Sequence, residues 1–403
     1  MIPFSPPHID QKIVDEVSKA LLSGWITTGP RTKQFENELT EYIGCKKTIC
    51  LSSATAGLEL ILRWYGVKAG DEVIVPAYTY CASANVIMHC GAKPVMVDCN
   101  AKDFNASVEA IRAAITSKTK VIIPVDISGY PADYDQINAL VHEPRIINQF
   151  VPETKEQEQL GRILVMADAA HSIGATMNGK QSGNLTDISV FSFHAVKNLT
   201  TAEGGAICLN LPEPFNCEKI YNDLNRMSLH GQSKDALAKT QIGNWKYDVI
   251  EPGYKCNMTD IQAAIGLVEL NRYESNLTRR KEIFKQYVDG FRSKDWAIIP
   301  PYKSEGKESS YHLFLLRIEG IKESKRDAIM QQIFEAGVSV NVHFQPLPLL
   351  TAYKSQGYIM SDYPEAWSKY ENEITLPVYF DLTDDQVKTI ISVVINSIEK
   401  VTR

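Results

Sequence analysis

The chain has 403 residues, of which 44% are hydrophobic and 22% charged, a composition typical of a globular protein. Its formal net charge of −6 and the lack of a long Lys/Arg run argue against a nucleic-acid partner. The N-terminus does not resemble a signal peptide, no apolar run reaches the length of a membrane span, and the cysteines lack zinc-site spacing. We therefore expect a cytoplasmic protein without membrane insertion and without a metal site.

Residues 47–210 alternate between strand-like and helix-like segments. Short apolar runs predict strands, and apolar residues at helical spacing predict helices between them. Because several runs are apolar on both faces, we expect an α/β fold with a mostly parallel sheet covered on both sides. The expected strands are 47–51, 71–76, 93–98, 121–125, 163–166 and 188–191, and the expected helices are 54–64, 81–89 and 107–115.

The second half of the chain has a different pattern. The polar stretch 143–161 is interpreted as a surface insertion or irregular excursion. The stretch 212–250 is interpreted as less regular chain, with Gly231, Gly243 and Trp245 in a loop. A long helical region is expected over 259–290, then a strand over 311–318 and helices over 324–336 and 384–399. This predicts a large domain over 1–250 and a smaller α+β domain over 251–403, with residues 1–30 packing on the small domain.

Polar motifs follow several of the expected strands, where ligands of open α/β sheets bind. The motif Ser52-Ser53-Ala54-Thr55-Ala56-Gly57 opens a helix, and its N–H groups and hydroxyls suit an anion such as phosphate. A plain N-cap is the alternative interpretation. Tyr80, in Tyr78-Thr79-Tyr80, either stacks on a cofactor ring or fills the core.

An acid and a lysine at neighbouring strand ends carry the most chemical information. Asp168 follows the run 163–166, and Lys197 follows Ser192 in the motif Ser192-Phe193-His194-Ala195-Val196-Lys197-Asn198. Such a lysine can hold the aldehyde of pyridoxal 5′-phosphate as a Schiff base, and such an aspartate can keep the pyridine nitrogen protonated. A helix cap is the alternative interpretation of Asp168. The apolar neighbours of Lys197 favour a desolvated, nucleophilic amine over a solvated surface lysine. His171 could contact the ring hydroxyl, or it is structural.

These motifs together resemble the DegT/DnrJ/EryC1/StrS family of fold-type I, pyridoxal-phosphate-dependent aminotransferases of nucleotide-linked keto-sugars. The resemblance covers nearly the whole chain. The enzymes it resembles most make UDP-4-amino-4-deoxy-L-arabinose and 4-amino-4,6-dideoxy-N-acetylhexosamines. Further motifs that carry it are Gly24-Trp25-Ile26-Thr27-Thr28-Gly29-Pro30, Gly70 to Pro76, Asp168-Ala169-Ala170-His171, Glu203-Gly204-Gly205, Pro252 to Asp260, Val342-His343-Phe344 and Leu376-Pro377-Val378.

The resemblance implies roles for individual residues. Lys197 and Asp168 would be catalytic, and the family forms homodimers in which the loop matching 253–260 reaches the neighbouring subunit's site. Many members have Asn at the position of Lys255 and Arg at that of Asn257. The implied cofactor-binding residues are Ala54, Thr55, Tyr80, Asp168, His171, Ser192, Lys197, Lys255 and Asn257. The implied substrate-binding residues are Trp25, Thr27, His194, Tyr311, His312 and His343.

The implied reaction moves an amino group from L-glutamate, which leaves as 2-oxoglutarate, to the 4-keto position of a UDP-linked sugar. Pyridoxamine phosphate is the intermediate form of the cofactor. A UDP-2-acetamido-2,6-dideoxy-4-keto-hexose is the expected substrate, with a UDP-4-keto-pentose as the alternative, in surface polysaccharide or glycan biosynthesis. A sugar dehydratase is less expected, because relatives with that activity carry histidine in place of Lys197. A non-catalytic pyridoxal-phosphate-binding regulator is a further alternative, disfavoured by the complete Asp168/Lys197 pair.

Overall fold

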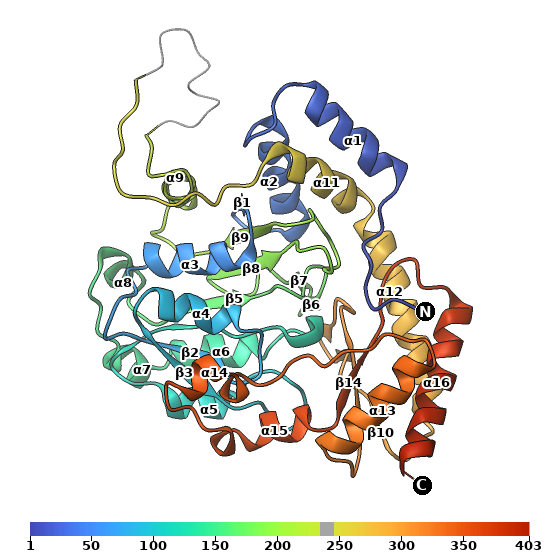
Figure 1. Cartoon of the computed structure of the whole chain (residues 1–403). Helices are drawn as coiled ribbons and strands as arrows, with labels where there is room; N and C mark the ends of the chain where they lie inside the picture. The colour runs from blue at the N-terminus through green and yellow to red at the C-terminus, as the bar shows by residue number, and fades with distance from the viewer. Residues whose placement is uncertain (234–245, 403) are drawn as a thin grey trace.

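The computed structural model describes residues 1–233 and 246–402, and a seven-stranded sheet lies at its centre (Figure 1). The strand order is β1-β9-β8-β5-β4-β2-β3. Neighbours from β8 to β3 are parallel, whereas β9 runs antiparallel to both β8 and β1. The strands are β1 (Lys47–Leu51), β2 (Glu72–Pro76), β3 (Lys93–Val97), β4 (Thr119–Ile122), β5 (Leu164–Asp168), β8 (Ile188–Ser192) and β9 (Gly205–Leu209). The predicted mostly parallel sheet is confirmed.

Helices cover both faces of this sheet, as the two-faced apolar strands predict. Val73 and Val75 of β2 belong to the apolar cluster that includes residues of α3 (Ala54–Trp64) and α4 (Ala82–His89). Ile74, between them, belongs instead to the cluster with α5 (Val108–Ala114) and α6 (Tyr134–Val141). This alternation follows from the two-residue period of a strand. Because the helices cover the faces of the sheet, the carboxyl ends of the parallel strands stay open for a ligand.

The N-terminal region contacts both parts of the chain. Ile2 pairs with Val338 and His8 lies 2.8 Å from Asp381, so the first residues pack on the C-terminal part. Helices α1 (Gln11–Leu22) and α2 (Pro30–Ile43) pack instead on α11 (Asp260–Asn271). The division at residue 250 stays a prediction, since α11 follows it and still packs on α2.

The C-terminal part forms a smaller α+β unit around an antiparallel sheet of order β10-β13-β14. Its apolar cluster joins that sheet to three long helices. A second small sheet pairs a hairpin of the C-terminal part with one from the large sheet's side, in the order β11-β12-β6-β7. The elements are α12 (Tyr273–Phe291), β10 (Ala297–Ile298), β11 (Lys303–Ser304), β12 (Lys307–Glu308), β13 (Phe314–Ile318), α13 (Glu323–Glu335), β14 (Glu373–Leu376), α16 (Asp384–Thr402), β6 (Thr176–Met177) and β7 (Lys180–Gln181).

Two stretches that were expected to be irregular contain helices. The stretch 143–161 folds into α7 (Pro144–Gln149) and α8 (Lys155–Leu160), and Gln157 is buried there with its side-chain amide donating to the carbonyl of Tyr65. Within 212–250, α9 (Cys217–Ser228) is helical, while 234–245 lies outside the described residues. The remaining short helices are η1 (Ile127–Gly129), η2 (Leu347–Leu349), α14 (Thr351–Lys354), η3 (Met360–Asp362) and α15 (Pro364–Tyr370). Among the described helices, none has the length and apolar character to cross a bilayer.

Candidate active site

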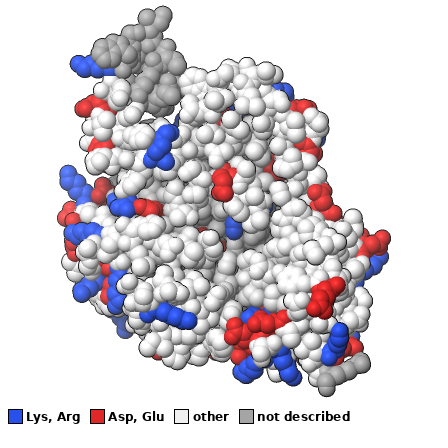
Figure 2. Space-filling view, in the orientation of Figure 1, with Lys and Arg blue, Asp and Glu red and all other residues white. Residues whose placement is uncertain are grey.

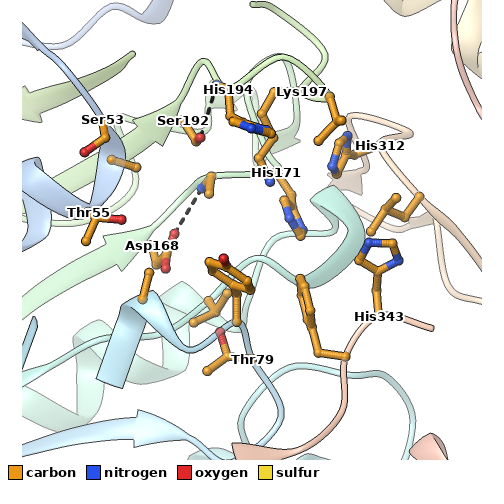
Figure 3. Close-up of a pocket in the computed structure, with 18 of the residues that line it drawn as sticks. Ser53, Thr55, Thr79, Asp168, His171, Ser192, His194, Lys197, His312 and His343 are labelled. Atoms are coloured by element: carbon orange, nitrogen blue, oxygen red, sulfur yellow. Dashed lines mark hydrogen bonds between the residues drawn. The ribbon is translucent and has the colours of Figure 1, made fainter. Parts of the chain in front are cut away.

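A cavity of about 470 Å³ opens where the parallel strands end. Figure 2 shows this face of the molecule hollowed near its centre, with most charged side chains toward the periphery. Figure 3 shows Ser53 and Thr55 at one end of the pocket and His312 and His343 at the other. Ten of the residues predicted from the sequence line it, namely Ala54, Thr55, Tyr80, Asp168, His171, Ser192, His194, Lys197, His312 and His343.

One end of the pocket is the N-terminus of α3. The Ser53 hydroxyl caps the helix by accepting from the N–H of Ala56 at 3.1 Å, so the predicted N-cap is present. The backbone N–H groups of Ala54 and Thr55 make no hydrogen bond within the described chain, and both residues line the pocket. Gly205 makes the close approach of β9 possible, because a Cβ there would lie 2.4 Å from the Ala54 nitrogen. Unpaired N–H groups and a helix dipole together suit a phosphate.

Asp168, the last residue of β5, lies on the pocket floor. The Ser83 hydroxyl donates to Oδ2 at 2.7 Å, and the N–H of Ala170 donates to Oδ1 at 3.2 Å. Burial raises the pKa of the Asp168 carboxyl, and these two donors and the charge of Lys197 oppose that rise. A buried carboxylate held from one side is suited to pair with a cationic nitrogen on the other.

Lys197 enters the pocket from the turn after β8. Burial lowers its pKa to about 8, and the nearby charge of Asp168 opposes this effect. The next residue fixes the turn, because the Asn198 amide donates to the carbonyl of Ser310 at 2.8 Å and its oxygen lies 2.8 Å from His312 Nδ1. At pH 7 an amine with a pKa of about 8 is neutral in roughly a tenth of the molecules, far more than an ordinary lysine, so it can act as a nucleophile and carry a proton.

Three histidines form the wall opposite the helix N-terminus. The rings of His171 and His312 lie 4.4 Å apart, and Phe344 stacks on His171 at 5.7 Å. Burial, aided by the charge of Lys197, lowers the pKa of His171 and of His312 well below the usual value and that of His343 to about 4. This wall is therefore neutral at physiological pH. A fourth histidine, His194, lies on the exposed rim, 3.6 Å from Glu203.

Five predicted site residues are not brought to the pocket of their own chain. Trp25 donates its indole N–H to the carbonyl of Thr28, and Thr27 is exposed. Lys255 is exposed, and its amine contacts the side chain of Asn257. Tyr311 points into the small-domain core, with an exposed fraction of 2%, and packs edge-on against Phe284. The substrate-binding role of Tyr311 therefore lacks geometric support within this chain.

Sequence reasoning missed several residues that shape the site. Ser83 supports Asp168, Phe344 stacks on His171, and Phe4 stacks on His343 at 5.6 Å. They come from a helix, a loop and the N-terminal segment, far apart in the chain. The only available signal was the position of Phe344 next to His343.

The pocket fits pyridoxal 5′-phosphate by its own chemistry. It has an anion site at α3, a buried carboxylate at Asp168 and a desolvated amine at Lys197. The Nδ1 atom of His171 is buried without a hydrogen-bond partner in the described structure, which marks a polar atom awaiting a ligand. Phosphate, pyridine nitrogen, aldehyde and ring hydroxyl are groups that these four features can bind.

Comparison with known proteins agrees with this geometry. The model of the DegT/DnrJ/EryC1/StrS aminotransferase family matches residues 7–148 and 151–395. The putative sugar aminotransferase Spr1654 from Streptococcus pneumoniae superposes with a TM-score of 0.96 in its PMP form, at 49% identity over 100% of both chains. Its PLP form gives 0.95 at 47% identity over 99% of both chains. The spore coat polysaccharide biosynthesis protein SpsC of Bacillus subtilis is 34% identical, covering 98% of this chain and 96% of its own. The predicted fold-type I architecture is thereby confirmed.

Proposed function

Because the chain belongs to the DegT/DnrJ/EryC1/StrS aminotransferase family, we propose that it transfers the amino group of L-glutamate to the 4-keto carbon of a UDP-linked sugar. The observation that carries this proposal is that Lys197 and Asp168 face one desolvated pocket. The sugar we favour is a UDP-2-acetamido-2,6-dideoxy-4-keto-hexose, and the product serves surface polysaccharide or glycan biosynthesis. The similarity to a spore coat polysaccharide biosynthesis protein supports that use.

The coarser part of this assignment is established by the family and by close relatives. The chain is a sugar aminotransferase dependent on pyridoxal 5′-phosphate, with pyridoxamine phosphate as the amino form of the cofactor. The cofactor predicted from the sequence is confirmed. When bound, it supplies a store for the amino group and an electron sink for the carbon that loses a proton.

The residues of the chain divide the remaining work. The N–H groups at the start of α3 and the Ser192 hydroxyl would hold the phosphate, and Asp168 would hold the proton at the pyridine nitrogen. Lys197 would hold the aldehyde of the cofactor, and its amine would take a proton from the substrate carbon as a base and return a proton as an acid. Tyr80 lies on the rim, with its ring centroid 5.9 Å from that of Phe344, and would cover the ring of the cofactor. The neutral histidine wall offers hydrogen bonds to the sugar without adding charge.

The decisive experiment is product analysis with the purified holoenzyme. Glutamate and a panel of UDP-4-keto sugars, including hexoses and a pentose, are supplied, and aminated sugar and 2-oxoglutarate are measured by mass spectrometry. The expected result is stoichiometric formation of both, and NMR of the sugar ring then gives the position and orientation of the amine. Lys197→Ala should abolish this activity, whereas Lys180→Ala on the exposed β7 should not. Normal turnover by the Lys197→Ala protein would refute the assignment.

We also infer a homodimer with shared sites. Lys255 and Asn257 do not line the pocket of their own chain, and the apolar side chains of Tyr247, Val249 and Ile250, a few residues earlier in the sequence, are exposed. A second copy would cover these side chains and bring Lys255 to the neighbouring phosphate site. Mixing Lys197→Ala protein with Lys255→Ala protein should form mixed dimers with one intact site and so exceed the activity of either alone. Light scattering checks the mass, and a monomer would contradict the inference.

A further inference from the structure

His343 is held from behind the pocket wall at three points. Its backbone N–H donates to Glu373 Oε2 at 3.1 Å, and its carbonyl accepts from the Tyr78 hydroxyl at 2.6 Å. Its ring Nδ1 lies 3.1 Å from Thr375 Oγ1. The rings of Phe4 and Phe344 flank the imidazole at 5.6 and 5.1 Å. With Nδ1 engaged by Thr375, Nε2 is the ring nitrogen left for a ligand in the pocket that His343 lines.

The supporting side chains lie on one face of β14. Because strand residues alternate, Glu373 and Thr375 share a face, and Ile374 and Leu376 point into the apolar core of the small domain. Thr375 Oγ1 lies 2.6 Å from Glu373 Oε1, at hydrogen-bonding distance. Both side chains are fully buried. The carboxyl, the hydroxyl and the imidazole therefore form one continuous hydrogen-bonded chain that ends at the pocket.

The direction of the hydrogen bonds from Glu373 through Thr375 to His343 depends on whether the Glu373 carboxyl is protonated. A hydroxyl has one hydrogen to donate. When Glu373 is ionised, Thr375 donates to it and must accept from His343, which then carries its proton on Nδ1 and presents a lone pair at Nε2. When Glu373 is protonated, it donates to Thr375, Thr375 donates to Nδ1, and the His343 proton lies on Nε2. On ionisation the carboxyl proton passes to Thr375, the Thr375 proton passes to Nδ1, and the Nε2 proton leaves to solvent.

We propose that Glu373 is a positioning residue which, through Thr375, sets the tautomer of His343 and so decides whether Nε2 accepts or donates a hydrogen bond in the pocket. The ligand of Nε2, a polar group of the sugar substrate, rests on the proposed function. The relay itself does not, since it is a property of three side chains of the protein.

The groups around Glu373 set the pH at which its carboxyl loses its proton. Burial raises the pKa of Glu373 to about 8, against the opposing effects of Thr375, the N–H of His343, Arg326 of α13 and Arg317 of β13. Tyr78 also faces the carboxyl, and burial keeps its pKa well above the usual value, so it remains neutral. The imidazole of His343, with its pKa near 4, remains neutral as well. Glu373 is thus the group in the relay whose protonation changes near neutral pH.

The direct test is nitrogen NMR of holoenzyme labelled at histidine, which distinguishes the two tautomers without any turnover. The His343 signal is assigned by its loss in His343→Gln. In the wild type it should move from the Nε2–H form near pH 6 to the Nδ1–H form near pH 9.5, with a midpoint of about 8. Glu373→Gln should lock the Nε2–H form at every pH, because its amide donates to Thr375. Thr375→Val should abolish the shift, and Thr375→Ser should retain it.

A matched control and a kinetic readout complete the test. Glu371→Gln makes the same substitution two residues away, where the carboxylate pairs with Lys322 at 2.9 Å outside the relay, and should behave as wild type. The KM for the keto-sugar should change about tenfold across the transition in the wild type, and this change should vanish in Glu373→Gln. A constant wild-type tautomer, or a normal shift in Glu373→Gln, overturns the relay. A normal shift without amination of any UDP-sugar overturns the proposed function alone.

Discussion

Removal of the Ser83 hydroxyl is the most informative single change in the site. Ser83 is fully buried, and its hydroxyl donates to Asp168 Oδ2 at 2.7 Å without being placed to touch the substrate. Asp168 has one other donor in the described structure, the N–H of Ala170 at 3.2 Å. Ser83→Ala therefore removes the shorter of the two hydrogen bonds that favour the ionised carboxylate.

The size of the effect follows from the chemistry of that bond. A hydrogen bond to a charged group contributes about 1.5–3 kcal/mol. Because about 1.4 kcal/mol corresponds to one pKa unit, the pKa of Asp168 should rise by about one to two units. A carboxyl that holds its own proton more tightly is a weaker partner for a protonated pyridine nitrogen. If the whole contribution of this hydrogen bond is lost from the transition state of the rate-limiting step, the reaction slows about ten- to a hundredfold.

The assay is a single-turnover reaction of the holoenzyme with saturating glutamate, followed by the absorbance of the bound cofactor. Cofactor affinity is measured in parallel by titration of the apoprotein. Ser189→Ala is the control, since Ser189 is equally buried and its hydroxyl pairs with Thr186 at 3.0 Å, away from Asp168. The control should react at the wild-type rate. A Ser83→Ala protein that folds normally and reacts within twofold of the wild type would refute this account of how Asp168 is held.

Three further changes test other parts of the molecule. In the apoprotein, the rate at which Lys197 reacts with an amine-directed reagent should rise with pH, with a midpoint near pH 8. Asp168→Asn should lower this midpoint, because it removes the negative charge that raises the pKa of Lys197. Peptide mass spectrometry measures the extent of labelling in both proteins. Gly205→Ala should weaken cofactor binding at least several-fold in the same apoprotein titration, since its Cβ would lie 2.5 Å from the carbonyl carbon of Ser53. Asp260→Ala should lower the free energy of unfolding by about 3 kcal/mol in urea titrations, because Asp260 is buried and accepts from Gly29, Arg31 and Thr32 at the start of α2.

The sequence predicted best what is decided locally. The helix over 54–64 follows from its apolar spacing and from Ser53 as its cap, and the structure has it at Ala54–Trp64. The positions of Asp168 and Lys197 at the pocket follow from a rule about the ends of parallel strands, so they too are readable without coordinates. By contrast the sequence pattern does not predict α9, although Ile220, Leu224 and Met227 have helical spacing, because the nearby Gly231 favours a loop.

What the sequence did not predict depends on contacts between distant segments. Ser83 reaches Asp168 across 85 positions, and the ring of Phe4 reaches His343 from the N-terminal segment. Tyr311 is the opposite case, a residue that the sequence places at the pocket and that packing directs elsewhere. It is next to His312, which lines the pocket, yet its own ring points into the small-domain core. A motif fixes where a residue lies along the chain, while side-chain direction is set by packing.

The distribution of charge in the pocket links the proton transfer proposed for Lys197 with the sugar recognition proposed for His343. Burial makes the histidine wall neutral, and it brings the pKa of two other groups to about 8, namely Lys197 in the described pocket and Glu373 behind the wall. Lys197 has to lose and regain a proton during transfer, and a cationic wall would lower its pKa further and weaken its return to the acid form. A neutral wall also places the recognition of the sugar on hydrogen-bond polarity. That is the property which a buried carboxyl behind His343 is placed to control.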